Sequence, residues 1–449
     1  MVKYKYYYKG IANDMKMNKK IINLLASAIC ISSIVGVQPT VLAVTEDMTD
    51  KSSDLSVSGT ADIIASGECG AYGDNLMYKL NSDGVLTISG QGEMADWFTN
   101  TVPWKDYKNS GKITRVIIHE GVTSVSTKAF VSCESLEYAF IPSSMKDIDG
   151  FTACSSLKSI NLPEGLETIG IQAFCDCDSL KTVTIPSSVN SIGFGAFEWC
   201  DSLTEIKVKS NNAYFTDING VLYNKDKTKI LQYPKAKTQT SYIIPSSVTT
   251  VGRDAFEECE NLKSIILPEK LTSIEESAFS SSGIKTIEMP AGVTTISRSA
   301  FNSSFIESIV LPNNIVKIDE MAFRNCKNLK KIFIQNPQCE IDDSFGTICS
   351  NLAFENAYRQ FDGIIYGYEN STAHAYAQKY EYPFSAFIYG DANSDGKLTA
   401  GDAAFIAKNL AEQKGHTLPA YADFTGDGKV TAYDAAMIAK YLAEQSLKN

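Results

Sequence analysis

A phrase of 22 or 23 residues recurs along the middle of this chain and limits what the chain can fold into. Its proline marks the period, with 23 residues from Pro163 to Pro186 and 22 residues from Pro268 to Pro290. Self-similarity with a fixed period of roughly 20 to 29 residues is typical of a leucine-rich-repeat solenoid, built from short parallel strands, turns and short helical segments. One repeat cannot bury its own apolar face, so the copies over residues 116–334 predict one elongated domain held together by contacts between neighbouring repeats.

One copy of the phrase, residues 180–200, shows how a repeat is expected to fold. Nearly alternating apolar residues predict a short strand that faces a core, and a proline then ends the strand at a turn. A second inward pair, a glycine turn and a brief helical turn follow, and the helical turn brings an aromatic ring and a thiol inward. In chain order these residues are Leu180, Val183 and Ile185, then Pro186, then Val189 and Ile192, then Gly193, then Phe197 and Cys200.

The cysteines follow the repeat instead of forming a disulfide framework. Of 11 cysteines, six stand three residues after a phenylalanine. Two repeats have Ser282 and Ser304 at this position, which indicates a small, weakly polar residue packed against its counterpart in the next coil. We therefore predict buried thiols, and we leave open whether Cys339 and Cys349, which lie outside the frame, form a pair. The six are Cys133, Cys154, Cys177, Cys200, Cys259 and Cys326.

A longer interval of 59 residues, from Pro186 to Pro245, contains an insertion. Its Asn219-Gly220 dipeptide predicts a β-hairpin. Together with the Ala-Phe-x-x-Cys units and the lead-in Asp83–Gly90, this pattern resembles the BspA-like leucine-rich repeat family of bacterial surface proteins, over roughly residues 66–387. The resemblance implies a solenoid and, for function, adhesion to host proteins or to other cells.

Both ends of a solenoid need a cap, because an open coil would expose its apolar core to water. We assign residues 66–115 to an amino-terminal cap and residues 116–387 to the repeats with a carboxy-terminal cap. In the latter, a strand over Phe361–Gly367 and a short helix over Ser371–Tyr380 are expected to close the stack.

Beyond the repeats, two loops, Asp391–Asp402 and Asp423–Asp434, match the calcium-loop template and start 32 residues apart. Calcium requires several oxygen ligands, so side-chain oxygens fall on alternate residues, a glycine permits the turn, and a carboxylate at the twelfth position completes the site. Thr425 stands where Asp or Asn would normally bind, so we expect the second site to be weaker or to use water. The predicted ligands are Asp391, Asn393, Asp395, Lys397 (through its carbonyl) and Asp402, then Asp423, Thr425, Asp427, Lys429 (through its carbonyl) and Asp434.

Each loop continues into nearly the same helix, over residues 402–413 and 434–445. Ile406 with Leu410, and Ile438 with Leu442, are four residues apart and predict one apolar stripe on each helix by which the pair packs. Because two such short helices bury little surface, calcium is expected to be structural, with two ions ordering the unit.

The duplicated loop-helix, with Asp at the twelfth position and no helix leading into the first loop, is similar to a type I dockerin over residues 388–449. Dockerins bind cohesin modules of scaffoldins in cellulosome-like complexes, so the resemblance implies a cohesin partner. In that family, loop residues ten and eleven and nearby helix residues make the contact. The difference between Gly401 and Tyr433 breaks the near-symmetry of the halves, from which we expect one preferred orientation on cohesin. The matching residues here are Ala400, Gly401, Ala407, Lys408, Ala432, Tyr433, Ala439 and Lys440.

At the amino terminus, a basic segment, Met17–Lys20, precedes an apolar run, Ile21–Val37, and small residues at Val41–Ala43. This order is typical of a secretory signal peptide, which we predict over residues 1–43 with a start at the first residue or at Met17. A membrane anchor is the alternative, but the run is short for a span. A flexible leader over residues 44–65 follows. No other segment is long enough to span a bilayer, so we expect a secreted protein held at the cell surface through a scaffoldin.

The net charge and the lack of catalytic motifs limit the classes of function that the chain can have. The net charge of −11 and the pI near 5.0 disfavour nucleic acid and anionic membranes as partners. The three histidines, His119, His374 and His416, belong to no nucleophile, phosphate-binding or metal motif, and His374 is expected to be a solvated residue of the closing helix. We therefore favour a non-catalytic recognition subunit whose solenoid binds a protein, a glycan or a cell surface.

The alternative is a polysaccharide-degrading hydrolase with its active site on the insertion, residues 214–233, or in the amino-terminal cap. This alternative stays open because two catalytic carboxylates can come from any Asp or Glu residues that approach in space, and no sequence motif reveals such a pair. An exposed aromatic row would favour recognition, and a deep acidic cleft with raised carboxylate pKa values would favour hydrolysis. Trp97, Trp104 and Trp199 are candidates for the row, although core packing is favoured for each.

Overall fold

The structure is a computed structural model that describes residues 61–97, 102–104, 112–351, 361–412, 418–425 and 429–446. The predicted signal segment 1–43, most of the leader 44–65, parts of the amino-terminal cap, His416 and the predicted ligand Asp427 lie outside these residues. Among the described residues, none of the helices has the length and apolar character that a bilayer crossing requires.

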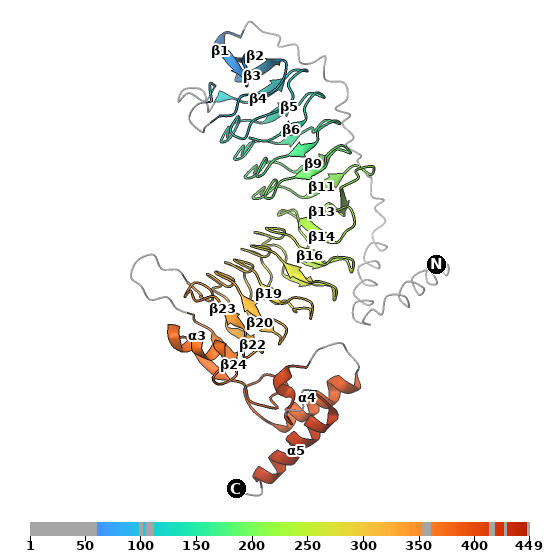
Figure 1. Cartoon of the computed structure of the whole chain (residues 1–449), viewed down its shortest axis with the longest axis vertical. Helices are drawn as coiled ribbons and strands as arrows, with labels where there is room; N and C mark the ends of the chain where they lie inside the picture. The colour runs from blue at the N-terminus through green and yellow to red at the C-terminus, as the bar shows by residue number, and fades with distance from the viewer. Residues whose placement is uncertain are drawn as a thin grey trace, which may run out of the picture. The chain divides into compact units, whose positions relative to one another are not determined.

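The repeats form a parallel β-solenoid, as predicted, whose coils are stacked one on another (Figure 1). One strand per coil builds a main row of parallel pairs, and isolated bridges continue the row where no strand is assigned. The strands of this row are β4 (Arg115–Ile118), β5 (Tyr138–Phe140), β7 (Ser159–Ile160), β9 (Thr182–Ile185), β11 (Glu205–Val208), β15 (Ser241–Ile243), β17 (Ser264–Ile266), β20 (Ser308–Leu311), β22 (Lys331–Ile334) and β24 (Ile364–Gly367).

Two-residue strands form a second parallel row on another side of the coils. They follow the turn that comes after the recurring proline of the repeat, and they pair one coil with the next. These strands are β6 (Asp147–Ile148), β8 (Thr168–Ile169), β10 (Ser191–Ile192), β16 (Thr250–Val251), β18 (Ser273–Ile274), β19 (Thr295–Ile296), β21 (Lys317–Ile318) and β23 (Glu340–Ile341).

The third side of each coil consists of turns. Where the sequence predicted a helical turn, Ala196 N donates to Gly193 O (3.3 Å) and Glu198 N donates to Gly195 O (3.0 Å), which gives two overlapping turns and no helix. Gly193 is required by close approach, because a Cβ there would lie 2.4 Å from the backbone nitrogen of Ile171 in the preceding coil. The side chains point inward as expected, except that Ile192 is only half-buried.

Stacked aromatic rings run through the turn side of the core. Trp104 stacks on Phe130, and the ladder continues through Phe151 and Phe174 to Phe197, with ring centroids 4.9–5.8 Å apart. A second ladder starts at Tyr233 in the insertion and passes through the phenylalanines of the later coils, with centroids 5.2–5.4 Å apart. Its further members are Phe256, Phe279, Phe301 and Phe323.

The repeated cysteines are buried thiols, as predicted, and they also make hydrogen bonds that the sequence did not indicate. Cys177 Sγ donates to Phe151 O at 3.2 Å, one coil away, and Cys200 Sγ donates to Phe174 O at 3.1 Å. Burial raises the pKa of these thiols, that of Cys200 to about 12, so they stay protonated and able to donate. The cysteine position therefore adds a hydrogen bond from one coil to a carbonyl in the core of the preceding coil.

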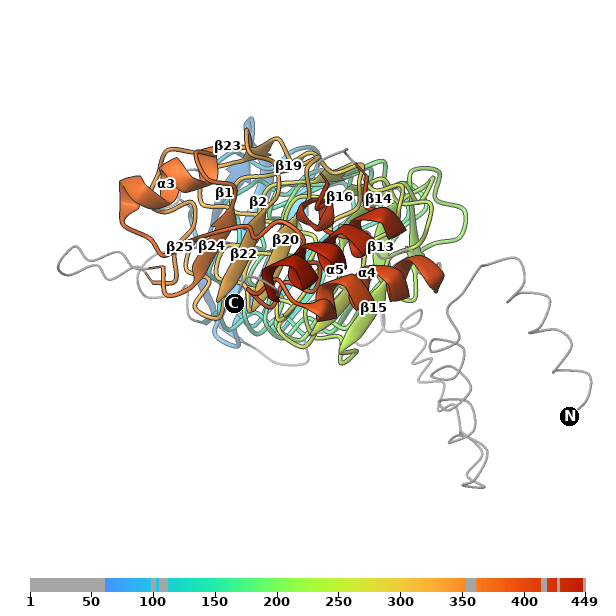
Figure 2. The ribbon, with the colours of Figure 1, turned by 90° about the horizontal axis from the view of Figure 1, so that it is seen from below.

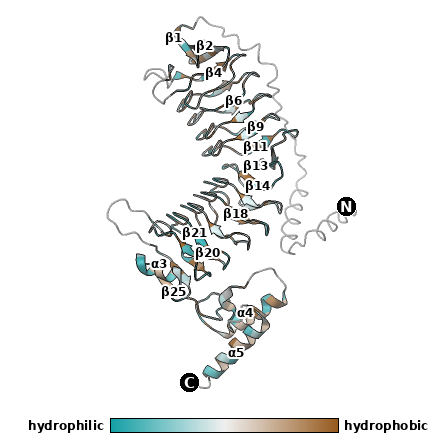
Figure 3. Ribbon diagram, viewed as in Figure 1, coloured by the Kyte–Doolittle hydropathy of each residue, from teal (hydrophilic) through white to brown (hydrophobic). Residues whose placement is uncertain are grey.

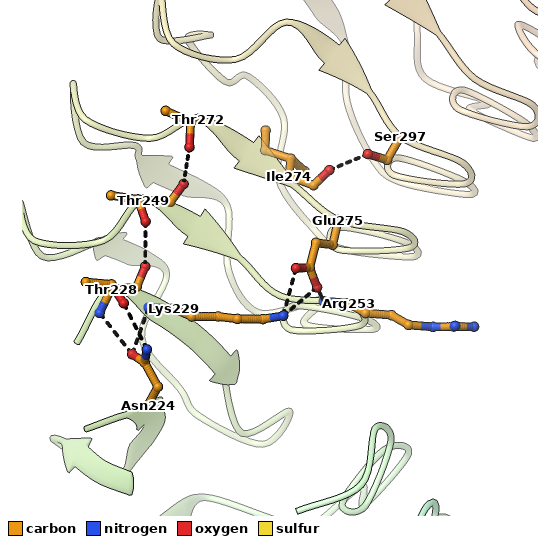
Figure 4. A network of polar contacts seen from close by, with 9 residues as sticks. All are labelled: Asn224, Thr228, Lys229, Thr249, Arg253, Thr272, Ile274, Glu275 and Ser297. Carbon is orange, nitrogen blue, oxygen red and sulfur yellow. Dashed lines mark hydrogen bonds and ion pairs between the residues drawn. The ribbon is translucent and has the colours of Figure 1, made fainter. Parts of the chain in front are cut away.

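The insertion interrupts the repeats as a hairpin, β12 (Phe215–Ile218) and β13 (Val221–Asn224), followed by β14 (Lys229–Gln232). Asn219 and Gly220 join the hairpin with φ of 53° and 75°, which confirms the predicted turn. β14 pairs in parallel with β16, and a polar network covers this junction (Figure 4). In it, Lys229 Nζ contacts Glu275 Oε1 at 2.7 Å across two coils.

At the amino-terminal end, three antiparallel strands lead into the solenoid: β1 (Ile63–Gly70), β2 (Gly73–Asn81) and β3 (Val85–Gly90), of which β3 pairs in parallel with β4. At the other end, β24 is followed by α3 (Thr372–Tyr380), capped by the side chain of Ser371, and by β25 (Phe384–Ala386). The expectation of a solvated His374 is wrong in part, since its ring is half-buried and stacks on Phe384 with centroids 4.3 Å apart.

The last part of the chain is helical, with α4 (Ala400–Ala411), a 3-10 turn η3 (Ala420–Ala422) and α5 (Ala432–Ser446). Figures 1 and 2 show α4 and α5 side by side, and each helix carries both hydrophobic and hydrophilic residues (Figure 3).

Candidate calcium loops and docking face

The first predicted calcium loop is a tight turn organised around two aspartates. Asp391 accepts hydrogen bonds from the backbone N–H groups of Asp395 (3.1 Å) and Gly396 (2.8 Å). Gly396 has φ of +83°, which explains the glycine at the sixth position. Asp391 and Asp402 are 5% and 0% exposed, whereas Asp395 is exposed. Burial raises the pKa of Asp391, because the charged form loses water, although the two N–H donors oppose this.

The twelfth residue of each loop ties the start of the loop to the start of the helix. One oxygen of Asp402 accepts from Asn393 N (3.2 Å), and the other accepts from Thr399 N (2.7 Å), the residue that caps α4. Asp434 repeats this with the N–H groups of Thr425 (3.0 Å) and Thr431 (2.8 Å). The Thr-x-x-Asp spacing of a capping box was present in the sequence and could have predicted this double role.

In the second loop, Thr425 lies between two carboxylates. Its hydroxyl is 3.2 Å from Asp423 Oδ1 and 2.9 Å from Asp434 Oδ1. Asp423 is 8% exposed and Asp434 is 0% exposed. Burial acts to raise the pKa of Asp434, but hydrogen bonds from Thr431 and Thr425 outweigh it and lower that pKa. A hydroxyl at the third position is thus placed where an oxygen ligand is needed.

These residues fit a bound calcium ion. Four aspartates, two in each loop, are at least nine-tenths buried in a unit with few large apolar side chains. Buried carboxylates are costly unless a cation or several donors neutralise them. All the side-chain donors predicted here are oxygens, which suits a hard cation. The four are Asp391, Asp402, Asp423 and Asp434.

The helices pack differently from the prediction at one position. Ile406 and Ile438 are both 0% exposed and lie in one apolar cluster with Ala392, Ala422 and Ala435. Leu442 packs against this cluster, but Leu410 does not belong to it and is 39% exposed. The predicted stripe on α4 therefore stops at Ile406, whereas the stripe on α5 continues to Leu442.

The eight residues carried over as cohesin contacts are all exposed. They occupy the first turn of each helix and the position two turns later, so each set lies along one side of its helix. Tyr433 is 61% exposed, while its counterpart Gly401 has no side chain. Leu410 adds an exposed apolar side chain near Ala407 that the sequence analysis did not assign to this face.

An acidic cluster that the sequence did not predict lies among the turns next to the insertion. One oxygen each of Glu198, Asp254 and Glu257 lies within 4.8 Å of the others. Burial, and then the neighbouring Glu198 carboxylate, raise the pKa of Glu257 to about 9. Burial and Glu198 also raise the pKa of Asp254 to about 6, although Arg253, 3.3 Å away, opposes this. Glu198 and Asp254 are nine-tenths buried, which leaves little room for a sugar ring.

Comparison with known proteins identifies both parts of the chain. The family model of the BspA type leucine rich repeat region matches residues 100–227 and 228–353. The chain belongs to this family. The model of the dockerin type I domain matches residues 389–443, so the helical part at the carboxy-terminal end is a type I dockerin domain.

Among solved structures, one match with a TM-score above 0.5 supports the solenoid. A leucine-rich repeat protein from Eubacterium ventriosum is 29% identical, with a TM-score of 0.52, over 61% of this chain and 80% of that chain. A leucine rich cell surface protein from Faecalibacterium prausnitzii is 22% identical over 62% of this chain and 97% of that one, with a TM-score of 0.41. A leucine-rich repeat protein from Bacteroides ovatus is 23% identical over 70% and 99%, with a TM-score of 0.40. No curated protein matches the chain.

The tryptophans of this BspA-type protein do not form an exposed row. Trp104 is fully buried and starts the first aromatic ladder, and its indole N–H donates to Ala129 O at 2.9 Å. Trp97 is half-buried against the same core, whereas Trp199 is 43% exposed. The prediction of core packing is therefore confirmed for Trp104 and wrong for Trp199.

Proposed function

We propose that this chain is a secreted, non-catalytic recognition subunit that docks through two structural calcium ions and its dockerin onto a cohesin-bearing scaffoldin of a cellulosome-like complex. The observation that carries the proposal is the repeated geometry of the two loops. In each, a buried aspartate at the twelfth position connects the loop to the first turn of a helix. Calcium in the loop would therefore fix the helix end that carries the docking residues.

The docking face is the exposed side of α4 and α5 at residues Ala400, Gly401, Ala432 and Tyr433, with the alanine and lysine pairs that follow in each helix. Small residues allow a partner to approach the helix backbone, and Lys408 and Lys440 offer charge at the rim. We add Leu410, whose exposed side chain would be covered in the complex.

The two halves of the face are unequal, which supports one preferred orientation on cohesin. The exposed ring of Tyr433 has no equivalent at Gly401. Aromatic residues often dominate binding energy at interfaces. Tyr433→Ala should weaken binding by about tenfold or more, and Gly401→Tyr should change the orientation or block docking. Equal effects of matched substitutions in the two halves would contradict a single orientation.

The direct experiment titrates the full chain with purified type I cohesin modules, with calcium and then with a chelator. We expect binding that is lost with the chelator and restored by added calcium. A pull-down from a secreted proteome, under the same two conditions, would then separate scaffoldins captured through the dockerin from ligands captured by the solenoid without calcium. Failure to bind any cohesin module would contradict the docking role.

A second candidate function, hydrolysis, has one observation in its favour. Glu257, whose pKa is raised to about 9, lies beside two other carboxyl groups, an arrangement that general acids share. The burial of Glu198 and Asp254 favours a structural role instead. Comparing the full chain with Glu257→Gln on soluble polysaccharides decides the matter, because only a hydrolase would release reducing ends and lose that activity in the variant.

A further inference from the structure

A basic hollow of about 680 Å³ lies on the solenoid surface, in a chain whose net charge is −11. Three lysines and one glutamate line it, which leaves a net charge of +2. The glutamate, Glu307, is already paired with Lys285 at 2.8 Å. The hollow is therefore positively charged, although the protein as a whole is negatively charged. The lining residues are Lys285, Phe305, Glu307, Ser308, Asn328, Lys330 and Lys331.

The lysines follow the register of the coils. Parallel bridges between Ser264 and Thr286 and between Glu288 and Val310, together with the pairing of β20 with β22, place four residues at one position of four successive coils. All four are exposed. Adjacent strands are about 4.8 Å apart, so the backbone positions of these four residues recur at about that spacing. The four are Lys263, Lys285, Glu307 and Lys330.

An exposed aromatic ring lies beside these lysines. Phe305 is 40% exposed, and Lys263 Nζ lies 5.6 Å from the centre of its ring. The coil between them has Gly283 at the position of Phe305, with no side chain to separate the two groups. A hydroxyl, Ser308, and an amide, Asn328, complete the lining. An aromatic face with ammonium, hydroxyl and amide groups around it suits a sugar ring that carries a carboxylate.

An acidic peptide fits less well. Side chains on one face of an extended peptide repeat at about 6.6 to 6.8 Å, which does not match the coil spacing. Tight peptide binding also relies on apolar anchors in buried pockets, and this hollow offers one ring. A linear acidic polysaccharide offers a sugar ring to Phe305 and carboxylates to the lysines at the same time.

We propose that this hollow binds a linear acidic polysaccharide with one carboxylate on each sugar ring. The carboxylates pair with Lys330 and Lys331 and compete with Glu307 for Lys285, and one ring packs on Phe305. The inference rests on the recognition role proposed for the solenoid and names the chemical class of its ligand.

The test measures binding of polygalacturonate to the full chain by calorimetry. We expect the triple variant Lys285→Gln, Lys330→Gln, Lys331→Gln to bind at least about tenfold more weakly, and Phe305→Ala to lose about three- to tenfold. Lys181→Gln is the matched control, because Lys181 occupies the same repeat position as Lys285 and Lys330 in a coil outside the hollow. Its affinity should equal that of the unmodified chain.

Two further ligands separate charge from ring stacking. Fully methyl-esterified polygalacturonate has the rings without the charge, and polyglutamate has the charge without the rings, so both should bind more weakly. Absence of binding to polygalacturonate, equal binding by the triple variant, or tighter binding of polyglutamate would overturn the proposal. Each variant is also titrated with cohesin: intact docking without polysaccharide binding refutes only this inference, whereas loss of docking by the unmodified chain refutes the proposed function.

Discussion

The solenoid and the dockerin are both built from small units that bury little apolar surface, but they are stabilised in different ways. Each repeat gains its core from the neighbouring coil, and aromatic ladders such as Phe130 to Phe197 run through the stack. The dockerin has no neighbour of its own kind. Its buried cluster contains two large aliphatic side chains, Ile406 and Ile438, with three alanines. Partly buried side chains such as Phe424 pack against it, and the two loops hold four buried aspartates. Repetition stabilises the first part, and an ion is expected to stabilise the second.

The largest expected effect comes from removing a calcium ligand of the dockerin, which should affect the dockerin and leave the solenoid unchanged. Asp434→Ala removes the carboxylate that joins the second loop to α5. We expect a loss of cohesin affinity of about 100-fold or more, with unchanged unfolding of the solenoid, because calcium binding and folding of the loop are coupled. Titration calorimetry measures the affinity. Gln445→Ala, next to the last residue of the same helix and away from the loop, is the control and should change little.

The next effect comes from removing a ring of the aromatic ladder, which should destabilise the solenoid and leave the dockerin unchanged. Phe174→Ala deletes a fully buried ring that stacks on both neighbours. The free energy of unfolding of the solenoid should fall by about 3–5 kcal/mol. Urea unfolding measures this change, and cohesin binding should stay the same. Phe194→Ala is the control, since that ring is 45% exposed and should contribute less than about 1 kcal/mol.

A separate prediction concerns the dependence of solenoid stability on pH and the acidic cluster. The pKa of Glu257 rises from its ordinary value of 4.5 to about 9 in the folded chain. Between these values the folded state holds a proton that the unfolded state has lost, so the stability of the solenoid should fall as pH rises from about 4.5 to 9. Glu257→Gln keeps a neutral side chain and should flatten this dependence. Thermal unfolding across this range tests it, and an unchanged slope in the variant would count against the assignment.

The smallest effect concerns the thiols. Cys177→Ala removes the hydrogen bond to Phe151 O and should cost about 1–2 kcal/mol. Cys177→Ser should cost less, because a hydroxyl can still donate to the Phe151 carbonyl. Urea unfolding of both variants distinguishes a hydrogen bond from packing alone: equal costs would indicate packing.

The sequence predicted those features that arise within one repeat or one loop. The period of the prolines, the Asn219-Gly220 turn and the alternate oxygens of the calcium loops each act over a few residues, so local chemistry determines them. The same reasoning missed contacts between coils. Glu198 and Asp254 meet only because the insertion packs in parallel with β16 and brings distant turns together.

The error at Leu410 has a related cause. Helical periodicity indicates which side of α4 is apolar, but it does not indicate where along the helix the contact with α5 ends. Leu410 is on the expected side and is still 39% exposed. The cysteine hydrogen bonds escaped prediction because the position of their acceptor, a carbonyl one coil away, depends on how closely the turns stack.

Amide hydrogen exchange of the full chain, with calcium and with a chelator, tests the central claim most directly. We expect the chelator to remove protection from residues 391–446 while residues 115–367 keep theirs, because only the dockerin depends on the ion. Unchanged protection of residues 391–446 in the chelator, or loss of protection in both regions, would contradict the division between a part stabilised by repetition and a part stabilised by calcium.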